Sequence, residues 1–193
     1  MSDEKERLPD HLVRPTSRRQ LRDEGVSRRQ LLRTSRRWAR TSHGFYVPAS
    51  VDATTVGQRL AQHSIRLPSD GAVGEWASGF LHGLPYCDGL SKDGRTRVDV
   101  PLYVGRRGRI HEVEGTRVSR EPLPASDLTE IAGIPCTVPL RSCFDGMRNA
   151  SDLVEAVVVG DLWLASGLVS PAGFTDYVAA HPGWRGVPQV RRA

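Results

Sequence analysis

Two short segments near the N-terminus repeat one pattern of polar and apolar residues. Residues 17–21 have the sequence Ser-Arg-Arg-Gln-Leu, and residues 27–31 repeat it without change. In each copy a glutamine follows a serine by three positions, which is the spacing of a capping box at the start of a helix. We therefore expect two helices, separated by Gly25, which favours the left-handed conformation that ends a helix.

Two helices joined by a short glycine-containing turn form a helix-turn-helix, whose second helix usually enters the major groove of DNA. Residues 37–40 and 45–48 flank a turn that contains Gly44, and this pattern predicts two short strands. The strands would form the wing of a winged helix. The small apolar core of this unit would consist of Leu21, Val26, Leu31 and Leu32.

A second interpretation of the same stretch extends the second helix to Trp38. Helical geometry then places five arginines within one face about 100° wide. These arginines are Arg29, Arg33, Arg36, Arg37 and Arg40. In both interpretations the arginines share one surface.

Beyond residue 50, apolar residues at helical spacing predict two further helices. Residues 52–66 place Val56, Leu60 and Ile65 along one face. Residues 71–83 carry a denser apolar set, which predicts a more deeply buried helix. That set consists of Val73, Trp76, Ala77, Phe80 and Leu81.

Three later segments predict a small sheet. Residues 98–104 alternate in the way of a strand, although Pro101 indicates an edge strand or a bulge. A strand over residues 116–120 and a hairpin over residues 128–138 complete the sheet. The hairpin is expected to turn near Ala132 and Gly133.

The C-terminal third predicts helices again. After a helix over residues 139–147, Ser151 is expected to cap a helix that runs to about Ala165 and ends at Gly167. A serine at the N-cap followed by proline predicts a third helix from Ser170, and the last residues begin a further helical pattern. The residues of the second helix that we expect to face inward are Leu153, Val157 and Leu164.

We therefore expect an α+β protein with two domains. Residues 1–10 are polar and form a flexible lead-in. A winged helix-turn-helix occupies residues 11–50, and a mixed α/β domain with a small sheet occupies residues 51–193. Most aromatic residues in small domains are structural, so we expect core packing for these residues: Trp38, Phe45, Tyr46, Trp76, Phe80 and Trp163.

Positive charge is concentrated in one window, residues 26–50. The whole chain has a formal charge of +5, whereas this window holds six arginines and no acid, so the remainder is slightly acidic. Such a distribution is expected when one surface faces a polyanion. A solvated helix face on an ordinary domain is the alternative explanation.

The expected contacts with duplex DNA differ along this window. Arg28 and Arg29, at the start of the second helix, are placed for base edges, where arginine pairs bidentately with guanine. Gln30 is placed to recognise adenine. His43, at the tip of the wing, either reaches a minor groove or is only a turn residue. Phosphate contacts, which fix register and give salt-dependent affinity, are expected from Arg33, Arg36, Arg37 and Arg40.

The composition argues against several other functions. Restriction-type nucleases need a lysine near paired acids, and the chain has only Lys5 and Lys92, neither in such a setting. The three cysteines and six histidines match no common zinc spacing, and an odd number of cysteines argues against a disulfide framework. No glycine-rich phosphate loop or nucleophile elbow is present. We therefore expect a protein that is not an enzyme and has no cofactor and no metal.

The chain also has no apolar run of about 20 residues, the length of a membrane span. Residues 1–10 are charged and lack the apolar core of a signal peptide. We therefore expect a cytoplasmic protein with no membrane partner.

Several short motifs occur in a characteristic order. Trp38, Arg40, Gly44 and Tyr46 belong to the wing-like segment, and Trp76, Ala77, Gly83 and Leu84 belong to the helix after it. Further motifs are Glu121-Pro-Leu-Pro with Asp127, residues 133–145, and His181-Pro-Gly-Trp-Arg-Gly. This order resembles that of the AbiEi-type antitoxin-like transcriptional regulators common in actinobacteria, and the resemblance covers roughly residues 15–193.

This resemblance implies a DNA-binding winged helix followed by a second domain. It implies a regulator that represses its own operon as the antitoxin of a type IV toxin-antitoxin pair, with a nucleotidyltransferase-like toxin as partner. Members of this group often continue into a domain similar to very-short-patch-repair endonucleases, which we do not find in this sequence. The alternative is therefore a DNA-targeting part of such a nuclease without its catalytic domain.

Overall fold

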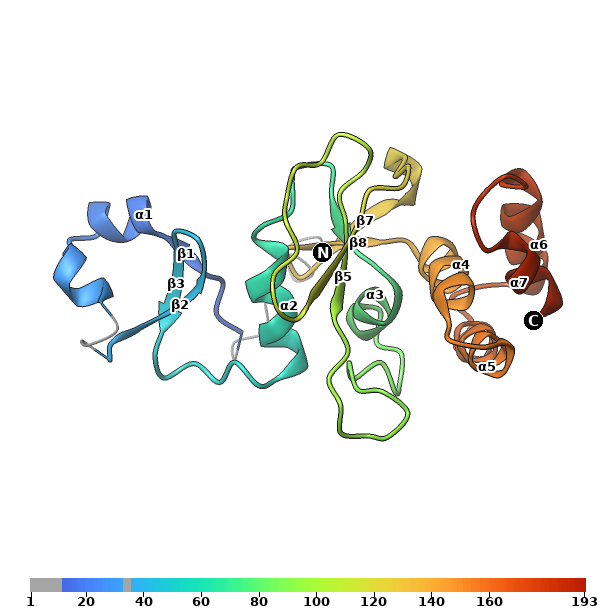
Figure 1. Ribbon diagram of the computed structural model, residues 1–193, viewed down its shortest axis with the longest axis horizontal. Coiled ribbons are helices and arrows are strands. Elements are labelled where there is room, and N and C mark those ends of the chain that lie inside the picture. Colours follow the sequence, from blue (N-terminus) through green and yellow to red (C-terminus); the bar gives the residue numbers. More distant parts are fainter. Residues whose placement is uncertain (1–11, 33–35) are drawn as a thin grey trace, which may run out of the picture.

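The computed structural model describes residues 12–32 and 36–193, and it has an α+β fold. Figure 1 shows three layers along the long axis. A small lobe formed by residues 12–50 lies at one end, a five-stranded sheet with two helices lies in the middle, and four helices lie at the other end. We refer to residues 12–50 as the N-terminal lobe and to residues 51–193 as the larger domain.

The N-terminal lobe is a three-stranded antiparallel sheet with two short helical turns. Its strands are β1 (Thr16–Ser17), β2 (Trp38–Ser42) and β3 (Phe45–Pro48), in the order β1-β3-β2. Between β1 and β2 lie the helix α1 (Arg18–Asp23) and the 3-10 helix η1 (Arg28–Leu31). The fully buried apolar residues of the lobe are Leu21 and Val47.

The first helix begins and ends where the sequence predicts. The Ser17 hydroxyl accepts a hydrogen bond from the Gln20 backbone N–H at 3.1 Å, as an N-cap serine does. Gly25 has φ +84°, and its N–H donates to the Arg22 carbonyl at 3.0 Å. The Val26 N–H donates to the Leu21 carbonyl, so the helix ends in the hydrogen-bond pattern of a Schellman motif.

The expected second helix is wrong in length. The capping box forms, because Ser27 Oγ accepts from the Gln30 N–H while Gln30 Oε1 accepts from the Ser27 N–H. The helix is nevertheless a single 3-10 turn that ends at Leu32, whose ψ of 146° is extended. One turn has little cooperative stabilisation. In addition, Arg28 and Arg29 place positive charge at a helix start, where the macrodipole favours acids.

The short second helix also makes other expectations for this stretch wrong. The second helix does not continue to Trp38, because Trp38 begins β2. Leu32 is 50% exposed and is not a core residue. Arg33 lies outside the described residues.

The wing-like hairpin is confirmed as a pair of antiparallel strands. Strands β2 and β3 pair in register from Trp38 opposite Pro48, and Gly44 in the turn has φ +80°. Strand β1 adds a third strand beside β3, with Thr16 opposite Tyr46. A strand of two residues has no detectable sequence period, so the pattern did not predict it. The aromatic side chains of the hairpin are half-buried.

The sheet of the larger domain is mixed. Its strands are β4 (Ala72–Val73), β5 (Val100–Tyr103), β6 (Thr116–Ser119), β7 (Leu128–Ile131) and β8 (Ile134–Thr137). The spatial order is β6-β5-β4-β8-β7, in which β5 pairs with β6 and β4 with β8 in parallel, while the other pairs are antiparallel. The predicted hairpin over residues 128–138 is therefore confirmed, with Ala132 and Gly133 at positive φ in its turn.

Two helices pack with this sheet, α2 (Val56–Ser64) and α3 (Glu75–Leu81). The helix expected from residue 71 begins later, because Ala72 and Val73 form the strand β4. Pro101 lies in the interior strand β5, so the prediction of an edge strand or bulge is wrong. Proline has no backbone N–H, but no hydrogen bond of the sheet is lost at this position. Pro101 lies opposite Gly74, just past the end of β4, and the Gly74 carbonyl accepts from the first turn of α3.

The C-terminal helices are α4 (Pro139–Asn149), α5 (Leu153–Ala165), α6 (Pro171–Ala180) and α7 (Val187–Arg192). Ser170 caps α6 as predicted. The cap of α5 is Asp152 and not Ser151, because the Asp152 carboxylate accepts from the Glu155 N–H at 2.8 Å. Leu153 is 37% exposed and does not face inward.

The core consists of two clusters. One lies on the sheet and includes Leu60 and Leu102, and the other lies among α4, α5, α6 and α7 and includes Phe144 and Trp163. The core prediction is confirmed for Trp163, which is 2% exposed, whereas Phe80 at 36% is on the surface.

Burial raises the pKa of the Cys87 thiol to about 11 and of the Cys136 and Cys143 thiols to about 12. All three cysteines are free.

The lobe is joined to the larger domain by the segment before β1. The buried side chain of Gln58 on α2 accepts from the Val13 N–H at 2.9 Å and donates to the Val13 carbonyl at 2.8 Å. Arg14 donates to the Gly133 carbonyl in the β7–β8 turn. Within the described parts of the chain, each helix is too short or too polar to cross a membrane.

Candidate nucleic-acid interface

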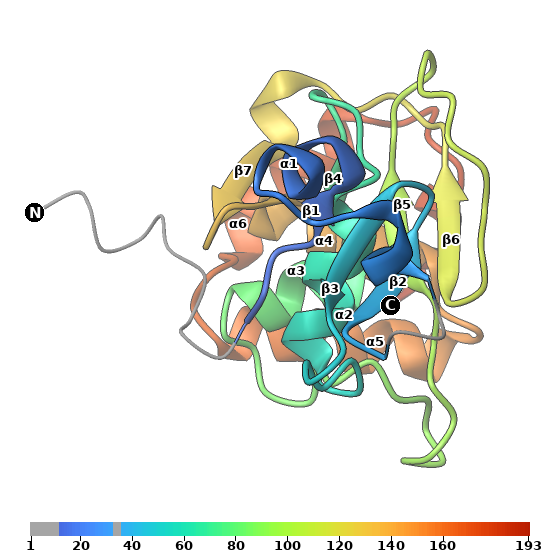
Figure 2. The ribbon, with the colours of Figure 1, turned by 90° about the vertical axis from the view of Figure 1, so that its left-hand side faces the viewer.

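The basic residues of the N-terminal lobe come from three neighbouring elements. Figure 2 views the molecule from the side of this lobe. Arg28 and Arg29 lie on η1, which packs against β2, while Arg36 and Arg37 precede β2 and Arg40 lies within it. The structure therefore brings η1 and the hairpin together, and every one of these arginines is exposed.

Two of the expected site residues contact each other in the hairpin. Arg40 Nη2 lies 3.1 Å from His43 Nδ1, and Arg40 Nε donates to the Ser42 carbonyl at 3.1 Å. The guanidinium of Arg40 is therefore held over the β2–β3 turn. A DNA phosphate near this turn would meet Arg40 and His43 as a unit.

Gln30 has a structural role that limits its use in recognition. Its side-chain oxygen accepts from the Ser27 N–H at 2.7 Å and from the Ser27 hydroxyl at 2.8 Å. Recognition of adenine by glutamine uses both the oxygen and the nitrogen of the carboxamide. Gln30 would have to release the cap of η1 to make that pair of bonds.

In the hairpin, Arg40 lies on the same face as aromatic side chains. Arg40 lies opposite Tyr46, and Trp38 lies opposite Pro48. Because alternate residues of a strand face the same side, Trp38, Arg40 and Tyr46 share one face of the sheet. This face therefore carries one guanidinium group and two half-buried aromatic rings.

Helix α1 adds basic residues that lie outside the basic window of residues 26–50. Arg18 and Arg19 are exposed on this helix. The nearby acids lie at its C-terminal end, where Arg22 and Asp23 form an exposed ion pair at 3.7 Å. The repeat of Ser-Arg-Arg-Gln could have indicated these basic residues, because each copy places two arginines at the same position in the first turn of a helix.

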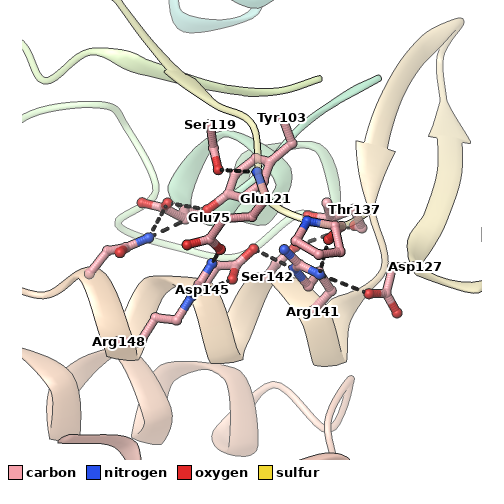
Figure 3. A network of polar contacts seen from close by, with 12 residues as sticks. Glu75, Tyr103, Ser119, Glu121, Asp127, Thr137, Arg141, Ser142, Asp145 and Arg148 are labelled. Atoms are coloured by element: carbon pink, nitrogen blue, oxygen red, sulfur yellow. Dashed lines mark hydrogen bonds and ion pairs between the residues drawn. The ribbon is translucent and has the colours of Figure 1, made fainter. Parts of the chain in front are cut away.

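A second set of charged residues lies in the larger domain and is buried. Figure 3 shows this network, which is centred on Arg141 and Asp145 of α4. Arg141 Nε donates to Asp145 Oδ2 at 2.6 Å, and its Nη1 donates to Asp127 Oδ2 at 3.0 Å and to the Pro122 carbonyl at 3.1 Å. Arg148 Nε donates to the other oxygen of Asp145 at 2.7 Å.

The electrostatics of this network favour the ionised guanidinium. Arg141 and Asp145 are both 0% exposed. Burial opposes the charge of Arg141, but the adjacent Asp145 carboxylate outweighs it and raises the pKa of Arg141. The Arg141 guanidinium also lies 4.4 Å from the centre of the Trp184 ring, which is a cation–π distance. Within the described chain, only Nη2 of this group has no hydrogen-bond partner.

Glu75 extends the network to the sheet. Its carboxylate accepts from the Tyr103 hydroxyl at 2.5 Å, from Arg117 at 2.6 Å and from the Asn149 amide at 2.9 Å. Burial raises the pKa of Tyr103 well above 10, so this hydroxyl remains a donor. Glu75 has φ +50°, a conformation that costs a non-glycine residue on the order of 1–3 kcal/mol.

The network therefore joins α3, α4, β5 and β6. Its acids accept from arginines, a tyrosine and an amide within the protein itself, so its interactions are structural. The i,i+4 spacing of Arg141 and Asp145 was visible in the sequence, but their burial was not. Among residues 12–32 and 36–193, no group of three or more metal-ligating side chains gathers at one point.

Comparison with protein-family models found no match, and comparison with curated proteins found none either. The functional argument therefore rests on the geometry and charge described above.

Proposed function

We propose that this protein binds duplex DNA through its N-terminal lobe and acts as a transcriptional regulator. The observation that carries this proposal is a set of exposed arginines with no role in holding the lobe together. The side chains of Arg28, Arg29 and Arg36 make no hydrogen bond or ion pair with the described residues. Such side chains are available to phosphates and to guanine.

The proposed contacts follow the order of the elements. Arg28 and Arg29 lie in the one turn of η1 and would recognise base edges in the major groove. Arg36 and Arg37 would contact phosphates, and Arg40 with His43 would bind the backbone beside the hairpin turn. Because η1 has only four residues, it offers fewer side chains for base recognition than a full recognition helix does.

The regulatory role is proposed from the resemblance to AbiEi-type regulators. In this proposal the lobe represses the operon of the protein, and the larger domain opposes a nucleotidyltransferase-like toxin. Co-expression with a nucleotidyltransferase-like protein encoded beside the gene is the test of the second part. Growth should be restored by the full chain, and a toxin that remains active would contradict the antitoxin role.

The direct test of DNA binding is a gel shift on the upstream region of the gene over a salt series. Arg28→Ala with Arg29→Ala should remove sequence preference and weaken specific binding at least tenfold, since each bidentate contact contributes about 1–3 kcal/mol. Arg191→Ala with Arg192→Ala makes the same change in charge on exposed residues of α7. Binding that is insensitive to salt, or equal effects of the two double variants, would overturn the proposed interface.

A further inference from the structure

A second cluster of exposed arginines lies far along the chain from the N-terminal lobe. The connection from β5 to β6 contains the run Gly105-Arg106-Arg107-Gly108-Arg109, and all three arginines of this run are exposed. None of them forms a hydrogen bond or an ion pair with the described residues. Figure 2 shows that the chain extends away from β5 before it returns as β6. We call residues 105–109 the arginine loop.

The backbone of the arginine loop has a defined turn. Gly105 has φ +63°, and its carbonyl accepts from the Gly108 N–H at 3.3 Å. A Cβ at Gly108 would lie 2.3 Å from the Val104 carbonyl oxygen, so a side chain has no room there. The two glycines therefore let the chain fold back on Val104 and direct the intervening residues outward.

Two other arginines hold the segment that follows the arginine loop. Arg66 donates to the His111 carbonyl, and Arg120 Nη2 donates to the Ile110 carbonyl at 2.8 Å. These are structural contacts between guanidinium groups and backbone. The chain thus uses some arginines to hold this connection in place and leaves three others without partners at its tip.

The acids near the loop do not neutralise it. Glu112 and Glu114 are exposed on the returning segment, and the Glu112 carboxylate accepts from the Val118 N–H at 2.9 Å. Among the described residues, neither of these carboxylates forms an ion pair with an arginine of the loop.

We propose that the arginine loop is a second phosphate-contact site, which binds the backbone of duplex DNA outside the sequence recognised by the N-terminal lobe. This inference rests on the proposed function. Three guanidinium groups on a short fixed turn suit phosphate oxygens, to which arginine donates bidentate, charge-assisted bonds. The loop contributes affinity and salt dependence and no base recognition, because its residues form a turn and not an element that fits a groove.

The test compares two triple variants that remove the same charge. Arg106→Gln, Arg107→Gln and Arg109→Gln together change the loop. Arg95→Gln, Arg191→Gln and Arg192→Gln together change exposed arginines elsewhere. Binding of each full-length variant is measured on the upstream DNA and on an unrelated duplex of equal length, from 50 to 200 mM salt.

We expect the loop variant to reduce the slope of log affinity against log salt by about 2–3, because each lost phosphate contact contributes about 0.9. Affinity at low salt should fall on the order of tenfold or more on both duplexes, so that the preference for the upstream DNA is unchanged. A loop variant that behaves like the charge-matched control would overturn the inference.

The same series separates this inference from the proposed function. If the loop variant keeps its affinity and slope while Arg28→Ala with Arg29→Ala loses sequence preference, the lobe binds DNA and the loop does not. If the loop variant weakens binding while the lobe variant has no effect, the loop is a site and the lobe assignment is wrong. Absence of DNA binding by the wild-type protein overturns both. Circular dichroism and thermal unfolding of each variant show whether it is folded.

Discussion

In the N-terminal lobe the arginines that the structure describes are exposed, whereas in the larger domain several are buried and hydrogen-bonded. Arg141 is 0% exposed and Arg59 is 7% exposed, and both donate to carbonyl groups inside the domain. The fold of the lobe therefore depends on a small apolar core that includes Leu21 and Val47, and on a short sheet. One residue type thus has a structural role in one region and is available for binding in the other.

This difference separates stability from binding. A substitution of a buried arginine in the larger domain should change stability, whereas a substitution of an exposed arginine in the lobe should change affinity for a polyanion.

Arg141→Met should lower the free energy of unfolding by about 3–5 kcal/mol. The change removes one partner of a buried ion pair and leaves Asp127 and Asp145 without it. Urea unfolding of the variant and of the wild type measures the loss. Arg95→Met is the control at an exposed position and should stay within about 0.5 kcal/mol. Equal stability of the two variants would show that the buried network does not stabilise the domain.

Leu21→Ala should unfold the lobe without unfolding the larger domain. Leu21 is 0% exposed, and truncation of a buried leucine to alanine costs about 2–5 kcal/mol. The core of the lobe is small, so this loss should exceed its local stability. Hydrogen exchange should become fast in β2 and β3 and remain slow in β5 and α4. Loss of protection in both regions would show that they unfold as one unit. Leu60→Ala in the larger domain is the matched control.

The stability of the larger domain should fall as the pH is lowered from 6.5 to about 4. Burial, with the nearby Arg66 and Arg59, lowers the pKa of His63 from 6.5 to about 4. The unfolded chain therefore takes up a proton in this range before the folded chain does. The loss at pH 4 is at most about 3 kcal/mol. His63→Gln should reduce the slope of stability against pH, and an unchanged slope would contradict the assignment. Burial also lowers the pKa of His82, which adds a smaller dependence in the same direction.

Ser27→Ala should have the smallest effect, about 1 kcal/mol and confined to η1. The change removes the hydroxyl that accepts from the Gln30 N–H. Exchange of the Gln30 amide proton should become faster, and affinity for DNA should decrease slightly because Arg28 and Arg29 are then less ordered. Ser17→Ala at the start of α1 is the matched control and should leave the exchange of Gln30 unchanged.

Local signals in the sequence were sufficient for several elements. The serine and glutamine of each repeat indicated two helix starts, and both serines do cap. Ala132 and Gly133 indicated the turn of a hairpin that the structure confirms. Ser170 followed by Pro171 indicated the start of α6. Each of these depends on hydrogen bonds or backbone conformations within about four residues.

Features that depend on distant partners were not visible in the sequence. Strands β1 and β4 have two residues each and exist only because β3, β5 and β8 pair with them. The interior position of Pro101 requires Gly74 opposite it to begin a helix. The buried network needs Asp127, from before β7, to meet Arg141 and Asp145 of α4. The sequence also did not single out the arginine loop, because the net charge of residues 51–193 hides it.

The sequence by itself determined where the charge lies along the chain and where α1, η1 and α6 begin, because both depend on neighbouring residues. Tertiary structure decided which short segments become strands, since β1 and β4 pair with β3, β5 and β8 from elsewhere in the chain. It also decided which arginines are structural and which are free to bind. That distinction depends on whether an acid or a carbonyl from a distant element lies within hydrogen-bond distance, and local sequence contains no such information.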